Sequence, residues 1–183
     1  EHQRAAIDRM QTRDALSESS NHFLVMDVGL GKTLTSLVYL YWWLCRNGGG
    51  IQYVLWVTPK GTPENLCRQL RDTWEVPVHM VPRVSLAVKP KPGDTRRIEL
   101  ERFKINVIHA DHLRIAIDQG LAAAAHGCLV VFDEVDEMYN ATHRTSAARR
   151  LAHLCPKFIA QTATPMRKNE AELRMWLRDT CRF

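Results

Sequence analysis

A short glycine-rich segment, Gly29-Leu30-Gly31-Lys32-Thr33, lies between an apolar run at 23–26 and a helical pattern at 33–46. Glycines allow backbone N–H groups to turn inward around phosphate oxygens, and the start of a helix adds a partial positive charge. A lysine in this position reaches the β- and γ-phosphates of a nucleotide, and the hydroxyl of the next threonine ligates Mg²⁺. The strand–loop–helix order therefore predicts a phosphate loop that binds ATP and Mg²⁺.

The loop departs from the general phosphate-loop pattern at one position. Met26 stands where that pattern has its first glycine, so we expect the shape of the loop to depend on Gly29 and Gly31. The alternative is a glycine turn followed by a chance Lys-Thr pair, and the flanking strand and helix argue against it. The residues expected to contact the nucleotide here are Gly29, Leu30, Gly31, Lys32, Thr33 and Leu34.

A second group of reactive side chains follows the apolar run at 129–132, where Asp133 and Glu134 stand side by side. In phosphate-loop ATPases the first acid of such a pair holds Mg²⁺ and the second polarises the attacking water. Taken alone, an acidic run that continues to Asp136 and Glu137 is more typical of the solvated start of a helix. The phosphate loop earlier in the chain favours the catalytic interpretation. The expected catalytic residues are Lys32, Asp133 and Glu134, and the expected Mg²⁺ ligands are Thr33 and Asp133.

Both groups depend on a scaffold in which strands and helices alternate. Apolar runs predict strands at 23–26, 53–57, 76–81, 104–109, 129–132 and 158–161, the third interrupted by Pro77. Helical patterns cover 33–46, 63–73, 111–118, 144–154 and 169–178. The apolar runs are continuous rather than alternating, which is typical of a parallel sheet covered on both faces. We therefore predict an α/β three-layer sandwich with a mostly parallel central sheet, formed by residues 1–183 as a single domain.

The helix expected at 33–46 places its apolar residues on one face, which comprises Leu34, Leu37, Val38, Tyr41 and Leu44. Trp42 and Trp43 belong to the same helix. Their rings could stack on nucleic-acid bases, but packing against the sheet or against another lobe is the more common use of such residues. We therefore expect the two tryptophans to be packing residues.

The composition is typical of a globular protein, with 45% hydrophobic and 25% charged residues. No apolar run approaches the roughly 20 residues needed to cross a bilayer, so we expect no membrane partner. The five cysteines are odd in number and form no CxxC pair, so we expect neither a disulfide framework nor a structural metal. These features favour an intracellular protein, cytoplasmic in a prokaryote or phage and nuclear in a eukaryote. The net charge of +5 is compatible with a polyanionic partner.

The phosphate loop and the acidic pair, in this order along the chain, resemble motifs of superfamily 2 helicases, in particular of the Swi/Snf-like branch of translocases. The segment Val28–Thr33 has the sequence VGLGKT and resembles MGLGKT of that branch. Asp133–Asn140, with the sequence DEVDEMYN, resembles DEAHRIKN, and Asp136 replaces the histidine. Thr162–Asn169, with the sequence TATPMRKN, resembles TGTPIQNN, and Ala163 replaces a glycine.

Three further segments extend the resemblance from Gln3 to about Leu177, nearly the whole chain. Gln3 precedes the phosphate loop by the family's usual interval and fits the glutamine that recognises adenine. Val54–Lys60 resembles the segment after the family's second strand, which meets the nucleic-acid backbone. Val107–Leu113 is a weaker match to the family's TSYELL segment.

The resemblance implies the first RecA-like lobe of an ATP-dependent translocase or helicase, with ATP and Mg²⁺ as cofactors. It implies nucleic acid as a partner, with double-stranded DNA favoured, and a second RecA-like lobe C-terminal to this chain. That second lobe supplies an arginine finger, which is worth roughly 10³–10⁵ in rate. We therefore expect residues 1–183 alone to bind ATP but to hydrolyse it weakly.

The resemblance also implies contacts with nucleic acid and a link between the two sites. The residues expected at nucleic acid are Thr58, Pro59, Lys60 and Ala110, and those expected to couple the sites are Asp136, Thr162 and Thr164. A basic segment at 82–97 either grips phosphates or forms a solvated loop. Two alternatives stay open beside the DNA translocase, namely an interaction module that has lost hydrolysis and the lobe of an RNA helicase.

Overall fold

The computed structural model describes residues 1–16, 21–47, 50–59, 62–81, 98–139, 142–165, 173–174 and 177–178. Within these residues, six strands form one sheet in the order β1-β6-β5-β2-β4-β3, and every neighbouring pair is parallel. The strands are β1 (His22–Val25), β2 (Tyr53–Thr58), β3 (Val78–Met80), β4 (Ile105–His109), β5 (Cys128–Phe132) and β6 (Lys157–Thr162). The sheet confirms the predicted α/β class, and each predicted run overlaps one strand.

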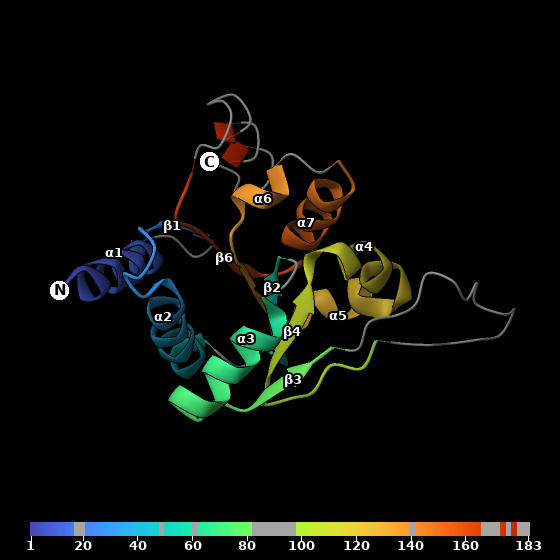
Figure 1. Ribbon diagram of the computed structural model, residues 1–183, viewed down its shortest axis with the longest axis horizontal. Helices are drawn as coiled ribbons and strands as arrows, with labels where there is room; N and C mark the ends of the chain where they lie inside the picture. Colours follow the sequence, from blue (N-terminus) through green and yellow to red (C-terminus); the bar gives the residue numbers. More distant parts are fainter. Residues whose placement is uncertain are drawn as a thin grey trace, which may run out of the picture.

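Helices cover both faces of the sheet and form the outer layers seen in Figure 1. One face carries α1 (His2–Leu16), α2 (Lys32–Asn47) and α3 (Pro63–Arg68), which continues in helical turns to Thr73. The other carries α4 (Leu113–Ala116), α5 (Ala122–Ala124) and α7 (Thr142–Leu154). The short α6 (Asp136–Tyr139) follows β5 beyond the carboxyl edge of the sheet. The helix predicted at 169–178 lies largely outside the described residues. None of the helices in the described part of the chain is long and apolar enough to cross a membrane.

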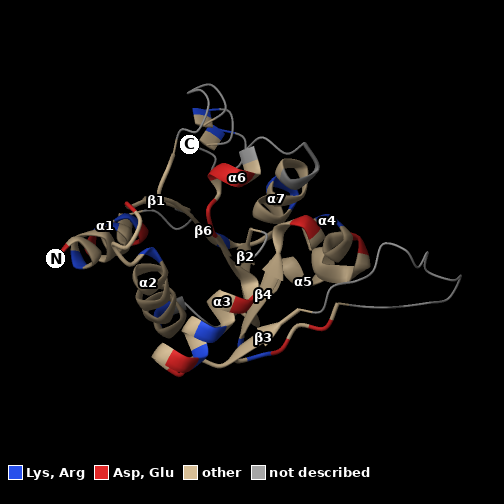
Figure 2. Ribbon diagram, in the orientation of Figure 1, with Lys and Arg blue, Asp and Glu red and all other residues tan. Residues whose placement is uncertain are grey.

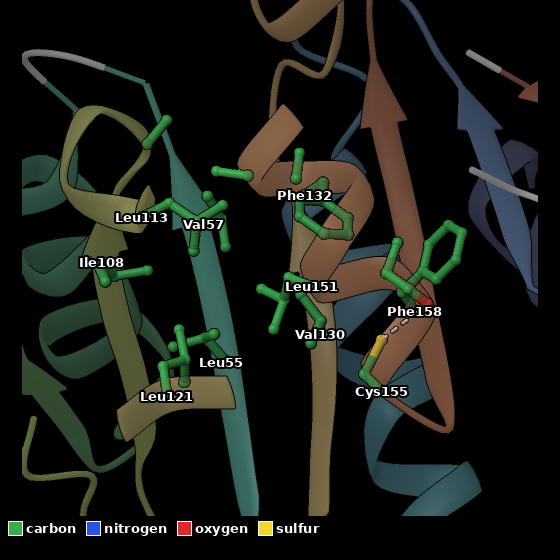
Figure 3. Close-up of a cluster of buried hydrophobic side chains, with 14 of the residues drawn as sticks. Leu55, Val57, Ile108, Leu113, Leu121, Val130, Phe132, Leu151, Cys155 and Phe158 are labelled. Atoms are coloured by element: carbon green, nitrogen blue, oxygen red, sulfur yellow. Dashed lines mark hydrogen bonds between the residues drawn. The ribbon is translucent and has the colours of Figure 1, made fainter. Parts of the chain in front are cut away.

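Successive residues of the central strands contribute to two separate cores, because side chains alternate between the faces of a sheet. Trp56 packs on the side of α1, α2 and α3, whereas its neighbours Leu55 and Val57 pack on the side of α4 and α7. Figure 3 shows this second core, in which strand residues meet helix residues, among them Val57, Ile108, Phe132, Leu113 and Leu151. A slip of one residue would exchange the two faces, so burial on both sides fixes the register of the strands and the positions of the residues at their ends.

The predicted apolar face of α2 packs only in part on the core, where Leu37 is partly buried. The residues of this face line an apolar groove beside the amino ends of β2 and β4, and they comprise Leu34, Leu37, Val38, Tyr41 and Leu44. Tyr41 is 74% exposed. The face on the sheet includes Thr35 and Ser36, which are fully buried. Their small hydroxyl side chains allow the helix to approach the sheet closely, and apolar periodicity gives no sign of this. Trp42 and Trp43 pack partly buried against the core, in agreement with the packing interpretation.

Helix α1, which has no counterpart among the predicted helices, is joined to the sheet by a buried polar cluster. Asp14 accepts hydrogen bonds from the Lys157 ammonium at 2.6 Å and from the Tyr39 hydroxyl, and it lies 2.9 Å from Nε2 of His22. These partners come from β6, α2 and β1, and all four side chains are at most 10% exposed. Burial lowers the pKa of His22 to about 4, lowers the pKa of Lys157 and raises the pKa of Tyr39. The imidazole is therefore neutral near pH 7, and Lys157 is the cation that balances Asp14.

Candidate nucleotide-binding site

The carboxyl ends of β1, β6 and β5 lie next to one another at one edge of the sheet. Val25 of β1 is level with Thr162 of β6, and Phe132 of β5 is level with Ala160 of β6. The glycine-rich loop leaves β1, the acidic pair leaves β5, and β6 lies between them. Because open parallel sheets bind ligands beyond the carboxyl ends of their strands, the topology brings the three sequence motifs to one site.

The glycine-rich loop turns through two residues in the left-handed region. Gly29 and Gly31 both have a φ of 83°, a value that residues with a side chain rarely adopt. The backbone N–H of Leu30 donates to the carbonyl of Asp27 at 3.3 Å, and that of Thr35 donates to the carbonyl of Gly31 at 2.9 Å as α2 begins. The loop therefore takes its shape from the two glycines, as predicted from the sequence.

Lys32 joins the loop to the acidic pair. Its Nζ donates to the carbonyl oxygen of Met26 at 3.3 Å and lies 3.6 Å from Oε1 of Glu134. The lysine side chain is 10% exposed and that of Glu134 is 33% exposed, so the two charges meet at the edge of solvent. By turning toward a phosphate, Lys32 would release the glutamate.

Asp133 is fixed at the end of β5 through one of its carboxylate oxygens. Oδ1 accepts hydrogen bonds from Nε2 of Gln161 at 2.7 Å and from the backbone N–H of Glu134 at 3.0 Å. Burial raises the pKa of Asp133, the Gln161 amide acts in the opposite direction, and the Glu134 carboxylate raises the pKa again. A buried carboxylate beside a second one favours a divalent cation, which would stabilise both ionised forms. Asp133, with Thr33 in the first turn of α2, therefore fits the Mg²⁺ of a nucleotide complex.

Glu134 occupies a strained turn just beyond Asp133, in the acidic stretch between β5 and α6 that Figure 2 shows. Its φ of 42° lies in the left-handed region, where strain of this kind costs about 1–3 kcal/mol. Main-chain hydrogen bonds hold both sides of the turn, from Asp133 to the carbonyl of Val57 at 2.8 Å and from Val135 to the carbonyl of Gln161 at 3.1 Å. The surrounding strands therefore maintain the turn that brings Glu134 to the lysine.

Asp136 links the acidic segment to the residues that follow β6. Its Oδ1 accepts a hydrogen bond from the Thr162 hydroxyl at 2.5 Å, and its Oδ2 accepts one from the Thr164 hydroxyl at 2.9 Å. The backbone N–H of Thr164 in turn donates to the Thr162 hydroxyl at 3.0 Å. The aspartate that replaces the Swi/Snf-like histidine is thus fully buried, with both carboxylate oxygens bonded to the two threonines.

Gln3, near the start of α1, lies directly on the phosphate loop. Its Nε2 donates to the carbonyl of Leu30 at 3.0 Å, and a side chain at Gly31 would collide with the Gln3 amide. An amide has two N–H donors and one oxygen acceptor, so this bond leaves one donor and the acceptor for an adenine edge. The position of Gln3 therefore allows both loop contact and base recognition.

Three of the residues expected at nucleic acid have buried side chains. Thr58 is fully buried and shares a 2.5 Å hydrogen bond with Thr62, Ala110 is 3% exposed, and Pro59 is buried as well. Main-chain N–H groups are therefore the donors that Thr58 and Ala110 could offer to a nucleic-acid backbone. Pro59 has no N–H, and its carbonyl accepts hydrogen bonds from Thr62. Leu34 likewise turns its side chain into the apolar groove, which leaves its main-chain N–H for a phosphate. Other parts of the motifs lie outside the described residues, namely Lys60, the basic segment 82–97, Asn140 and residues 166–169.

Two buried polar residues of the site were not predicted from the sequence. Gln161 donates to Asp133, and Ser36 of α2 donates to Oε1 of Gln161 at 2.6 Å. A glutamine within a largely apolar strand was the available signal, because a buried polar side chain requires a partner. Ser36 gave no such signal, since a serine in a helix has many uses.

A parallel sheet with a glycine-rich loop after β1 and an acidic pair after β5 defines a phosphate-loop ATPase lobe of the RecA-like kind. The sequence matches the family described as DEAD/DEAH box helicase over residues 1–173, and the chain therefore belongs to that family. Residues Asp133–Asp136, with the sequence DEVD, have the Asp-Glu-x-Asp form that appears in the family's name.

Two solved structures share the fold. The Sulfolobus solfataricus SWI2/SNF2 ATPase core in complex with dsDNA has a TM-score of 0.65 and 18% identity, over 97% of this chain and 35% of that one. The Pyrococcus furiosus Hef helicase domain has a TM-score of 0.67 and 18% identity, over 98% of this chain and 35% of that one. This chain thus spans about a third of the length of each, and at this identity the likeness shows the fold alone. No curated protein matched the sequence.

Proposed function

We propose that this chain is the ATP-binding lobe of an ATP-dependent translocase or helicase that acts on double-stranded DNA. The observation that carries the proposal is the meeting of Lys32 and Glu134, 3.6 Å apart, with Asp133 beside them. Hydrolysis requires a phosphate-binding lysine and a water-polarising acid at the same phosphate, which this arrangement provides. Membership of the DEAD/DEAH box helicase family supports the same conclusion.

Each side chain at the site takes a role that fits its contacts. Lys32 exchanges its bonds to Met26 and Glu134 for phosphate oxygens and balances their charge. Thr33 and Asp133 would hold Mg²⁺, which when bound would neutralise charge on the phosphates. Glu134, once released from the lysine, accepts a proton from the attacking water.

Asp136, Thr162 and Thr164 are the proposed link between the nucleotide and nucleic-acid sites. The carboxylate of Asp136 follows the catalytic pair by two residues and is held by both threonine hydroxyls. A shift of the turn after β5 would therefore move Asp136, and its hydrogen bonds would move the segment after β6 with it. Contiguous hydrogen-bonded networks of this kind can carry coupling, provided that both sites bias the same element.

DNA and a second RecA-like lobe are the proposed partners. One structure with the same fold is a complex with dsDNA, and the net charge of +5 favours a polyanion. Main-chain N–H groups of Thr58 and Ala110, with the Lys60 side chain, would contact the backbone without reading its sequence, and Pro59 would lie beside them without a donor of its own. The chain spans 35% of each structural neighbour, which is compatible with a second lobe in a protein of that kind. An intracellular location follows from this proposal.

Hydrolysis assays on the full-length protein test the proposal. We expect Mg²⁺-dependent ATP hydrolysis that duplex DNA stimulates more than RNA. Residues 1–183 alone should bind ATP but hydrolyse it slowly, since a second lobe's arginine finger contributes roughly 10³–10⁵ in rate. Stimulation by RNA only would favour an RNA helicase lobe, and binding without hydrolysis would favour an interaction module. A chain that binds no nucleotide would overturn the proposal.

Substitution of Gln3 by alanine should reduce the preference for ATP over GTP. The amide offers a donor and an acceptor to adenine, and guanine reverses that pattern, so we expect a loss of preference of roughly fivefold. The bond from Gln3 to Leu30 is lost as well, so both nucleotides should show a smaller common loss. Calorimetric titrations with ATP and with GTP measure both effects, and Gln11→Ala on the same helix is the control. Equal losses for the two nucleotides would mean that Gln3 only supports the loop.

A further inference from the structure

A hydrogen-bonded chain runs through the core from α2 to the acidic pair. The Ser36 hydroxyl donates to Oε1 of Gln161 at 2.6 Å, and Nε2 of Gln161 donates to Oδ1 of Asp133 at 2.7 Å. Ser36 and Gln161 are both fully buried, although 125 residues separate them in the sequence. The chain thus joins the helix that begins at Lys32 to the partly buried Asp133 at the end of β5, and its Ser36 and Gln161 members have no contact with solvent.

The chemistry of its two ends fixes the orientation of the Gln161 amide. An ionised carboxylate only accepts hydrogen bonds, so the amide must direct its NH₂ group toward Asp133. The amide oxygen then faces Ser36, whose hydroxyl supplies the proton. Rotation of the Asp133 carboxylate would leave a buried N–H without an acceptor, which is unfavourable. The amide therefore restricts the carboxylate to one orientation.

Gln161 also holds the acidic turn through its main chain. Its carbonyl accepts a hydrogen bond from the backbone N–H of Val135 at 3.1 Å. The next residue, Thr162, faces the other side of the sheet, and its hydroxyl bonds to Asp136. Two consecutive residues of β6 thus hold the acids on either side of Glu134, whose strained φ of 42° requires such support.

We propose that Gln161 is a positioning residue that orients Asp133 for Mg²⁺ and, through Ser36, keeps this carboxylate aligned with the helix that carries Thr33. The inference rests on the proposed function, because it needs Asp133 to serve the metal. Groups that hydrogen-bond to a metal ligand typically change metal affinity or activity about 10–100-fold when they are removed. The Ser36–Gln161 pair therefore supports the metal site by orienting its ligand, without contacting the metal.

The substitution Gln161→Met tests this inference, because methionine keeps the length of the side chain and removes both of its hydrogen bonds. Calorimetric titration of the chain with ADP, once with Mg²⁺ and once with EDTA, separates the metal-dependent part of the affinity from the rest. We expect Gln161→Met to lose roughly tenfold or more of the affinity gained from Mg²⁺, with its affinity in EDTA unchanged. Ser36→Ala should lose a smaller part of the gain, because the bond from Gln161 to Asp133 remains. Gln69→Met, at an exposed glutamine, is the control and should match the wild type.

Three outcomes would overturn the inference. The first is a Gln161→Met chain that keeps the full gain from Mg²⁺. The second is an equal loss in Mg²⁺ and in EDTA, which a general loosening of the fold would produce. The third is a wild type that binds ADP equally well in both media, because the proposed Mg²⁺ site itself then fails. If circular dichroism shows that Gln161→Met does not fold, Ser36→Ala decides, and only a loss confined to the Mg²⁺ medium supports the inference.

Discussion

Glu134→Gln in the full-length protein will abolish ATP hydrolysis and leave nucleotide affinity close to that of the wild type. Glutamine keeps the size of the side chain that lies 3.6 Å from Lys32, but it cannot accept a proton from water. Loss of a general base should lower the rate by roughly 10²–10⁴. Phosphate release in the presence of duplex DNA measures the rate, and calorimetry measures the affinity.

Asp133→Asn is the matched control, because it changes the neighbouring carboxylate to an amide in the same way. Asp133 is the proposed Mg²⁺ residue, so this variant should lose the Mg²⁺-dependent part of nucleotide binding as well as hydrolysis. The contrast between the two variants separates a base from a ligand. Hydrolysis by Glu134→Gln at the wild-type rate would show that the base is another group, and equal losses of binding would show that both acids serve the metal.

The main groups of the site could be predicted from the sequence because they lie in contiguous motifs. The loop that carries Lys32 and the pair that contains Glu134 each follow an apolar strand, and parallel strands present such segments at one edge. The roles of Gln161 and Ser36 could not be predicted in this way. Their contact joins residues 125 positions apart and depends on how closely α2 approaches β6.

The fold class also followed from the sequence, since continuous apolar runs alternate with helical patterns. Helix α1 did not, because it is largely polar and only a narrow apolar face, with Met10 buried and Ala6 and Ile7 partly buried, packs on the core. A narrow apolar face, together with the specific contacts of Asp14 and Gln3, determines where this helix lies. The order of the strands in the sheet could not be predicted from the sequence, because local patterns do not specify which strands pair.

The variant Lys157→Met should destabilise the fold by about 3–5 kcal/mol near pH 8, as expected when one partner of a buried ion pair is removed. Nζ of Lys157 lies 2.6 Å from Asp14, and both side chains are at most 10% exposed. Without the lysine, the carboxylate stays buried beside a neutral imidazole. Urea unfolding followed by tryptophan fluorescence measures the change. The control is Lys104→Met, whose ammonium pairs with an exposed Glu101 and should matter little because solvent screens that pair.

The loss of unfolding free energy caused by Lys157→Met, relative to the wild type, should become smaller as the pH falls below about 6.5. In the wild type the pKa of His22 is about 4 when folded, below the ordinary 6.5, so the unfolded state takes up the proton first and stability declines between these values. Burial is the main cause of the low pKa, and the charge of Lys157 is the next. Without that charge the pKa of His22 rises, and a protonated imidazole 2.9 Å from Asp14 replaces the missing cation. A loss that stays constant from about pH 8 to pH 5 would mean that burial alone keeps His22 neutral, so that its imidazole does not replace the ammonium of Lys157.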